Sequence, residues 1–378
     1  MKLKRKILPS VLLAILSIGI ITENETFQAS PASHQPLSQQ IVAPSWEAPG
    51  FAVDENGVLW KVGNAIFDLS TGQRRTQLTR LMENVATISH NQPSITNDEV
   101  VHGKLYVLTN DGVLWNWRCR SYTVYEVIES VQFTRLVPVL PDFNEAPIKI
   151  MTDVNSVFAG SGHTLAVDVN GNLWAWGRNN SGQIGDGTQT DRSEPVKVMN
   201  NISTAGVDTF ASWAITDDGN FYMWGATAND SFFALLRNAG AFTPVRIAEG
   251  VIAAVHGPLA TYLLGEDGRL WSFSNSGEEP KVVLYNVIDV VSGSIDVLAI
   301  RSDNSLWFWT IEWGDNPYEF SLIKTEPIFI ASDVVAADIG QRIIAVHVDG
   351  SIMIWDWPMG RTGVESITTV PVRMRVER

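Results

Sequence analysis

The stretch AGSGHTLAVDVNGNLWAWGRNNSGQIGDGT, residues 159–188, decides the fold. Its two short apolar segments, LAVDV and LWAW, flank the dipeptide Asn170-Gly171, which is a strong signal for the tight turn of a β-hairpin. A glycine-rich polar run at 177–187 follows the second segment. Because weaker copies of the same hairpin recur along the chain, the repeat predicts the architecture before any single residue does.

The chain contains seven such hairpin patterns, whose turn positions are 36 to 59 residues apart. A further apolar segment begins with proline in six units, and a short Val/Ile/Ala segment precedes the next hairpin. Four short antiparallel strands per unit, repeated seven times, predict an all-β fold, a seven-bladed β-propeller. Proline has no N–H to donate, so the strands that it begins are expected at sheet edges. The turns centre on Gly57, Gly112, Gly171, Gly219, Gly268, Asn304 and Gly350, and the prolines are Pro147, Pro195, Pro244, Pro280, Pro327 and Pro371.

Two aromatic positions recur in the third strand of each unit, as in Leu-Trp-x-Trp at 173–176. Strand alternation puts both on one face, and we expect them to fill the core between blades. The first position holds Trp60, Trp115, Trp174, Tyr222, Trp271, Trp307 and Met353, and the second holds Val62, Trp117, Trp176, Trp224, Phe273, Trp309 and Trp355. The remaining tryptophans are therefore the ones expected to be exposed: Trp46, Trp213, Trp313 and Trp357.

The central stretch resembles the repeat of the regulator of chromosome condensation family, whose members fold as seven-bladed propellers. The resemblance extends over about residues 40–376 and indicates a secreted bacterial member. It implies fold more strongly than function, because the family serves different functions. One secreted bacterial propeller of this kind inhibits β-lactamases, and other members promote nucleotide exchange on a nuclear GTPase. The structural repeat positions here are Gly160, His163, Thr164, Gly171, Trp174, Trp176, Gly177, Gly182, Gln183 and Gly185.

The N-terminal segment has the pattern of a signal peptide. A basic start, Lys2 to Lys6, precedes a mainly apolar run at 7–21, which is shorter than the roughly 20 residues of a membrane span. Small residues favour cleavage after Ala32, and an anchored N-terminal helix is the alternative. We therefore expect a signal peptide at 1–32, a linker at 33–40 and the propeller at 41–378, in a secreted or cell-envelope-associated protein without stable membrane insertion after cleavage.

The charge and cysteine content restrict the partners and the stabilising chemistry. The net charge is −14, and residues 33–378 alone carry 23 basic and 39 acidic side chains, a net of −16. Such acidity argues against nucleic acid and anionic membranes, which attract clustered Lys and Arg. Cys119 is the only cysteine, so no intramolecular disulfide forms and the core must hold the fold.

The sequence contains no catalytic, metal or cofactor motif. Its six histidines have no metal-ligand spacing, and His163 occupies a repeat position that indicates a structural hydrogen bond. The glycine-rich run lacks the lysine of a phosphate-binding loop, and Gly-x-Ser-x-Gly is absent. We therefore expect a non-enzymatic protein without cofactor, although a pair of carboxylates for hydrolysis stays an open alternative.

Aromatic residues in the longer connections are the candidates for binding. We predict a protein-interaction module that binds a protein partner through loops at one end of the propeller, because aromatic residues and Arg anchor interfaces. A carbohydrate or cell-envelope binder is the alternative, and a propeller hydrolase or a secreted inhibitor of an enzyme is a further one. These loops could also bury their own aromatics. The candidates are Tyr122, Tyr125, Phe143, Phe232, Phe233, Trp313 and Tyr318.

Overall fold

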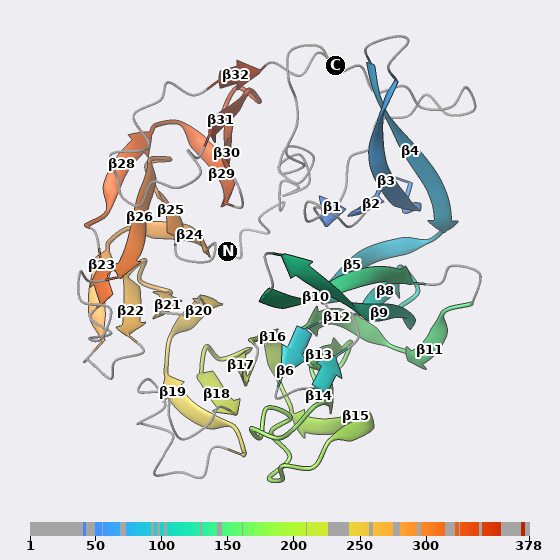
Figure 1. Cartoon of the computed structure of the whole chain (residues 1–378). Coiled ribbons are helices and arrows are strands. Elements are labelled where there is room, and N and C mark those ends of the chain that lie inside the picture. The colour runs from blue at the N-terminus through green and yellow to red at the C-terminus, as the bar shows by residue number, and fades with distance from the viewer. Residues whose placement is uncertain are drawn as a thin grey trace. The chain divides into compact units, whose positions relative to one another are not determined.

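A computed structural model of the chain consists of strands and turns wherever it describes the residues (Figure 1). No helix long and apolar enough to cross a membrane occurs among those residues. The predicted signal segment and linker, 1–40, lie outside the described part. The described residues are 41–42, 50–54, 56–68, 73–91, 94–96, 99–101, 104–128, 131–141, 146–160, 162–208, 210–225, 242–256, 260–274, 280–292, 296–313, 322–324, 326–339, 342–356 and 372–374.

The strands form seven antiparallel sheets of four or five strands, and one two-stranded sheet, β6–β7. Five of the large sheets pair four consecutive strands in sequence order; blade 2 has the order β10-β9-β8-β5 with β11 also on β9, and blade 6 the order β24-β25-β26-β27 with β28 also on β26. This is the architecture of a seven-bladed β-propeller, so the predicted fold class is confirmed. The chain divides into two compact units, 1–214 with 242–244, and 215–241 with 245–378.

The first unit contains blade 1 (β1–β4), blade 2 (β5 and β8–β11), blade 3 (β12–β15) and the start of blade 4. The strands here are β1 Ile41–Val42, β2 Gly50–Val53, β3 Leu59–Asp68, β4 Gln73–Met82, β5 Val85–Asn91, β6 Ser94–Thr96, β7 Glu99–Val101, β8 Lys104–Thr109, β9 Leu114–Ile128, β10 Val131–Pro141, β11 Ile148–Met151, β12 Val154–Ala159, β13 His163–Asp168, β14 Leu173–Gly177, β15 Arg192–Met199, β16 Ile202–Val207 and β17 Ala211–Thr216.

The second unit begins within β17 and contains the rest of blade 4 (β16–β19), blade 5 (β20–β23), blade 6 (β24–β28) and blade 7 (β29–β32). Its strands are β18 Phe221–Gly225, β19 Val245–Ala248, β20 Val251–His256, β21 Ala260–Gly265, β22 Leu270–Ser274, β23 Lys281–Leu284, β24 Val287–Ser292, β25 Asp296–Arg301, β26 Leu306–Trp313, β27 Leu322–Lys324, β28 Ile328–Ala331, β29 Val334–Ile339, β30 Arg342–His347, β31 Ile352–Asp356 and β32 Val372–Met374.

One turn geometry joins the second and third strands of every blade. The N–H of the turn residue donates to the C=O three residues earlier, as Gly171 does to Asp168 at 3.0 Å. All seven turn residues have φ between +62° and +81°, a region that glycine adopts without steric penalty and that asparagine tolerates. Asn304, with φ +62°, is therefore an acceptable replacement for glycine in blade 6. The predicted turn positions are confirmed.

The same turns connect consecutive blades through the backbone. In six places the C=O of the turn residue accepts the N–H of the first residue of a following strand, at 2.7 to 3.0 Å, as Gly171 does from Ile202. The residue before that strand also has positive φ, and in five places its C=O accepts an N–H from the next blade's turn at 2.7 or 2.8 Å. These reciprocal bonds satisfy backbone groups at the blade ends. The five acceptors are Asn84, Asp153, Gly250, Asn286 and Asp333.

The strands that begin at proline are the outer ones, as predicted. Among the described strands β11, β15, β19, β23, β28 and β32 each pair only with the third strand of their blade. Five of the six prolines stand immediately before such a strand. Pro195 instead lies inside β15, where the register with β14 shifts between Ala175 and Gly177.

The two aromatic positions differ in burial, which corrects the expectation that both fill the core. At the second position Trp117, Phe273 and the other described side chains are at most 8% exposed. At the first position every residue is only partly buried. The first position lies nearer the turn than the second. An indole N–H there points toward polar groups of the turn, as Trp174 Nε1 donates to Asp168 at 3.0 Å. Trp213, expected to be exposed, is half-buried against Gly206.

The longer connections between third and fourth strands are partly β-hairpins and not loops. β9 continues to Ile128 and pairs with β10 from Cys119 onward, which places Tyr122 opposite Val137 and Tyr125 opposite Thr134. β3 and β4 form a second such hairpin, and β26 with β27 a third. The extra residues therefore extend strands of the blades.

Candidate functional site

The repeat residues of blade 3 form a buried hydrogen-bond chain. His163 is fully buried at the start of β13, and its Nε2 lies 2.7 Å from Ser212 Oγ on β17. Ser212 donates its only hydroxyl proton to the C=O of Gln183 at 2.9 Å, so it must accept from His163. The geometry therefore assigns the neutral tautomer with the proton on Nε2. This supports the structural role predicted for His163 and Gln183.

Burial also decides the charge state of this histidine. Burial lowers the pKa of His163 to about 4, against smaller raising effects of the Asp208 carboxylate and the Ala211 backbone. The ring is thus neutral at pH 7. A neutral, fully buried imidazole whose Nε2 proton is donated to Ser212 links β13 of blade 3 to β17 of blade 4.

The glycine-rich run after β14 is held by its own side chains. Asn179, which is fully buried, donates through Nδ2 to the C=O of Thr188 at 3.0 Å and accepts from the N–H of Ile184 at 2.9 Å. Asp186 forms an ion pair with Arg192 at 2.5 Å. Burial raises the pKa of Asp186, but the bonds from Thr188 and Arg192 outweigh burial and leave that pKa below its ordinary value. Side-chain hydrogen bonds and this ion pair therefore fix the conformation of the run.

The predicted binding residues lie mostly outside the described part. The backbone places Tyr122 and Tyr125 on the β9–β10 hairpin, and Trp313 at the end of β26, opposite Leu322. All three stand on the connection between third and fourth strand. The other four candidates lie outside the described residues: Phe143, Phe232, Phe233 and Tyr318.

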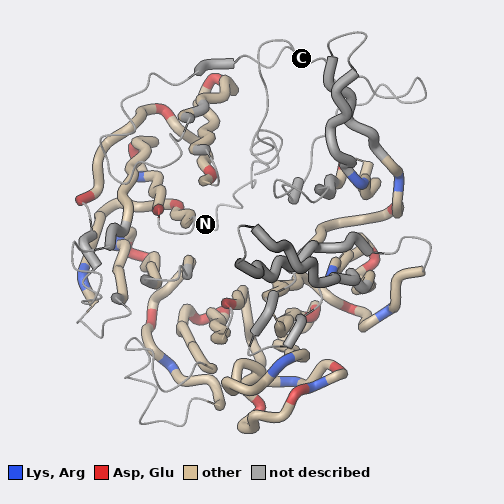
Figure 2. Tube along the Cα trace, viewed as in Figure 1, with Lys and Arg blue, Asp and Glu red and all other residues tan. Residues whose placement is uncertain are grey.

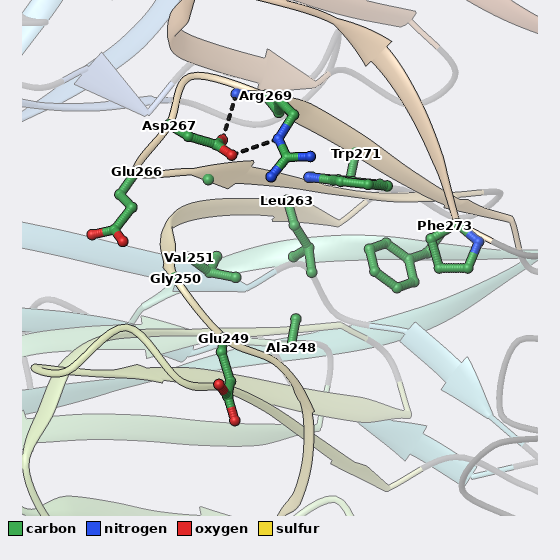
Figure 3. Close-up of a pocket in the computed structure, with 12 residues that line it drawn as sticks. Ala248, Glu249, Gly250, Val251, Leu263, Glu266, Asp267, Arg269, Trp271 and Phe273 are labelled. Atoms are coloured by element: carbon green, nitrogen blue, oxygen red, sulfur yellow. Dashed lines mark hydrogen bonds and ion pairs between the residues drawn. The ribbon is translucent and has the colours of Figure 1, made fainter.

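A hollow of about 550 Å³ lies beside the tight turn of blade 5 (Figure 3). Trp271 and Phe273 of β22 and Leu263 of β21 form an apolar wall, and the end of β19 with the start of β20 forms the opposite side. In Figure 3 the acidic side chains lie at one end of this space and Phe273 at the other. The acidic lining residues are Glu249, Glu266 and Asp267, and Arg269 is the basic one.

Beside the hollow, blade 5 lacks a side chain that the other blades carry. Three residues before the turn glycine, blades 1 and 3 have Asp54 and Asp168, whose carboxylates accept the indole N–H of the partly buried tryptophan. Blades 2 and 4 have threonine there, and its hydroxyl bonds to the turn backbone. Blade 5 has Gly265 at this position, and Gly265 lines the hollow.

Blade 6 places an arginine over the equivalent tryptophan from the other side of the turn, where blade 5 uses Arg269 over Trp271. Arg301 replaces Gly265 there, and its guanidinium carbon lies 5.4 Å from the ring centroid of Trp307. Arg301 Nε also donates to the C=O of Tyr285 at 3.0 Å, and Phe329 packs edge-on against Trp307 with ring centroids 6.1 Å apart. The position of Tyr285 corresponds to Glu249 beside the hollow.

Charges in the hollow are only partly compensated. Arg269 lies 5.2 Å from the ring centroid of Trp271 and pairs with Asp267 at 2.5 Å. Hydrogen bonds from the Arg269 backbone and side chain hold the pKa of Asp267 below its ordinary value. Glu249 pairs with Arg246 outside the hollow at 2.8 Å. Three lining carboxylates thus face one lining guanidinium.

This hollow was not predicted from the sequence. Its signal is the glycine before Glu266-Asp267-Gly268, where the aligned turns have Asp, Thr, Arg or His. Acidic and basic residues are interspersed along the described strands (Figure 2), so composition does not mark it either. Within the described residues no group of three or more His, Cys, Asp or Glu is placed to hold a metal ion.

Comparison with known proteins identifies the repeat. Residues 154–183 and 170–212 match two models of the regulator of chromosome condensation (RCC1) repeat. No curated protein sequence matches the chain. Human WBSCR16 is similar in structure, with a TM-score of 0.50 and 15% identity over 78% of this chain and 83% of that one. Prp20p of Saccharomyces cerevisiae has a TM-score of 0.50 and 16% identity over 77% of this chain and 76% of its own.

Identities this low are informative about the fold alone, whereas the repeat models match specific residues of blades 3 and 4. Those matches cover the stretch around His163, Gly171 and Gln183 from which the repeat was predicted. The chain is therefore a seven-bladed β-propeller whose residues 154–212 match the regulator of chromosome condensation repeat.

Proposed function

We propose that this propeller is an exported, non-enzymatic protein-binding module whose partner contacts the hairpins between third and fourth strands. The observation that carries the proposal is the β9–β10 hairpin. β9 has 15 residues, against 5 for the equivalent β14, and from Cys119 to Ile128 it pairs with β10. Among the described strands β10 pairs only with β9.

A hairpin that extends from a rigid blade suits protein recognition for two reasons. Its outer backbone N–H and C=O groups can add a strand from a partner, and its side chains supply contact area at little ordering cost. Tyr122 and Tyr125 on β9, and Trp313 on β26, are of the residue types that anchor interfaces. The Prp20p structure is described together with its binding to Gsp1p and histones, so protein binding occurs on this architecture.

Affinity capture tests the function. The purified chain, immobilised, is exposed to secreted and envelope fractions of its own organism, and retained proteins are identified by mass spectrometry. We expect one protein to be retained saturably, and a Tyr122→Ser/Tyr125→Ser bait to retain at least tenfold less of it. Trp60→Phe, which changes an aromatic residue beside the turn of blade 1, is the matched control and should retain it normally.

Three results would contradict the proposal. Retention of wall polysaccharide without protein would favour the carbohydrate alternative, and turnover in a hydrolase substrate screen would favour an enzyme. Equal retention by the wild-type and the tyrosine-substituted bait would remove the hairpin from the interface. Circular dichroism of each bait verifies that the strands are intact.

A further inference from the structure

We propose that the outer edge of β10 in blade 2 binds an extended segment of a basic protein partner, which adds a strand to the sheet. The inference rests on the proposed protein-binding function and deepens it, because it names the backbone groups that hold the partner and the kind of segment that fits. β10 consists of Val131–Pro141, and among the described strands it pairs only with β9 (Figure 1). Its other edge is thus unpaired within the described part of the chain, and such an edge is a template for a further strand.

The register of the hairpin decides which backbone groups of β10 face outward. Ile128 pairs with Val131, and only two residues separate them, so this pair must exchange both of its N–H···O=C bonds. The register is unbroken from this pair to the pair of Ser121 and Pro138. Because bonding alternates along an antiparallel ladder, every second residue of β10 directs its N–H and C=O away from β9. These outward residues are Gln132, Thr134, Leu136 and Pro138.

Pro138 agrees with this assignment and limits the length of the edge. Proline has no N–H, so it fits a ladder where its nitrogen points away from the neighbouring strand, as the register places it here. Beyond Pro138 the register with β9 shifts before Pro141. An antiparallel partner strand would thus exchange two hydrogen bonds with each of the three outward residues at 132–136 and donate one more to the C=O of Pro138.

The hairpin also lacks the third strand that a ribbon of this kind needs. β8 pairs with β9 only as far as Arg118, and β11 pairs with it only at 114–116. From Cys119 onward the described strands therefore form a ribbon of two, which is marginally stable in water without a third strand or other packing. The β26–β27 hairpin has three paired positions, against nine in β9–β10. A segment bound along β10 would supply the missing strand.

Charge selects the kind of partner. Arg135 is the only charged residue of β10, so the edge carries little of the charge that commonly protects exposed strands from pairing. The whole chain has a net charge of −14, which attracts a basic protein and repels a second copy of the chain. Backbone bonds do not read side chains, so the segment is defined by its extended conformation and by the absence of proline at the positions that bond β10.

Residue-resolved hydrogen exchange of the free chain tests the edge without knowledge of the partner. We expect the outward amides, those of Gln132, Thr134 and Leu136, to exchange at least tenfold faster than the inward amides between them, which bond β9. Equal protection of the two sets would mean that another part of the chain already covers the edge. That result would overturn the inference.

Two substitutions at one position then test strand addition itself. Thr134→Pro removes an outward N–H and leaves the bonds to β9 in place, as Pro138 does, whereas Thr134→Ala removes the side chain and keeps the N–H. The probe is the protein that affinity capture retains, purified and titrated against each variant. Thr134→Pro should bind it at least tenfold more weakly than Thr134→Ala. Pro138→Val adds an outward N–H and should bind it two- to tenfold more tightly than wild type. Protection of the inward amides in each variant verifies that the hairpin is intact.

The outcomes separate this inference from the proposed function. Equal binding by Thr134→Pro and Thr134→Ala would overturn strand addition and leave protein binding by the hairpin intact. A captured protein that is acidic would overturn the selection by charge. Dimerisation of the free chain in sedimentation, abolished by Thr134→Pro, would assign the edge to a second copy and overturn the basic partner. Capture of no protein would contradict the proposed function and this inference with it. A basic protein that Thr134→Ala binds and Thr134→Pro does not would establish the site.

Discussion

Acidification from pH 7 to pH 4 should weaken the junction of blades 3 and 4 through one residue, His163. Its pKa in the fold is about 4, against 6.5 in an unfolded chain. Between these two values the unfolded chain binds a proton that the folded chain does not, so the free energy of unfolding falls as the pH falls. Above pH 6.5 His163 adds no pH dependence to the free energy of unfolding. Below pH 4 the stability that depends on its neutral form is fully lost.

The magnitude follows from the difference of the two pKa values. At about 1.4 kcal/mol per unit, the shift corresponds to a loss of about 3 kcal/mol by pH 4 and of about 2 kcal/mol by pH 5. Acids such as Asp186 add their own pH dependence, so the comparison needs a variant that differs only at this residue. His163→Gln is suitable, because its amide nitrogen can still donate to Ser212 and does not titrate.

Urea unfolding of both proteins at pH 7, 6, 5 and 4 gives the assay. At pH 7 we expect wild type to be more stable by about 1 to 2 kcal/mol, because the flexible glutamine side chain fills the buried space of the imidazole less well. This advantage should shrink as the pH falls and change sign near pH 5. A difference that stays constant from pH 7 to pH 4 would refute the buried, neutral assignment of His163.

Three further predictions concern single residues. Tyr106→Phe removes the hydroxyl that accepts from Trp176 Nε1 and from Thr164 Oγ1, both at 3.1 Å, so the free energy of unfolding should fall by about 1 to 3 kcal/mol in urea titrations. Asn304→Val forces a β-branched residue to φ +62° and should lower the thermal unfolding midpoint, whereas Asn304→Gly should not. Burial raises the pKa of Asp296, so its charge destabilises the fold at pH 7; Asp296→Asn should raise the urea midpoint at pH 7, and this gain should vanish near pH 3.

The repeat could be predicted because its signals are local. Turn glycines, the Leu-Trp-x-Trp register and a leading proline each act within a few residues, and seven copies reinforce one another. Asn304 was placed at a turn although it is not glycine, because its neighbours kept the register. The Asn, Asp and Gly acceptors that precede a new blade, such as Asn286, follow an equally local pattern, which was not predicted.

The features that could not be predicted depend on contacts between neighbouring repeats. Strand alternation puts Trp174 and Trp176 on one face, but only the next blade decides how much of each ring is covered. The β9–β10 hairpin was expected as a loop because its residues lack turn signals and alternate weakly. The hollow lies between the turn of blade 5 and the Glu249 segment of the preceding blade, and the sequence of a single repeat does not show this pairing.

Hydrogen–deuterium exchange with and without the captured protein tests the central claim most directly. If the chain binds its partner through the β9–β10 hairpin, amides of 119–141 should exchange at least tenfold more slowly in the complex. Amides at the turn of blade 3, around Gly171, should exchange equally in both states. Unchanged exchange over 119–141, with protection confined to other parts of the chain, would contradict the account.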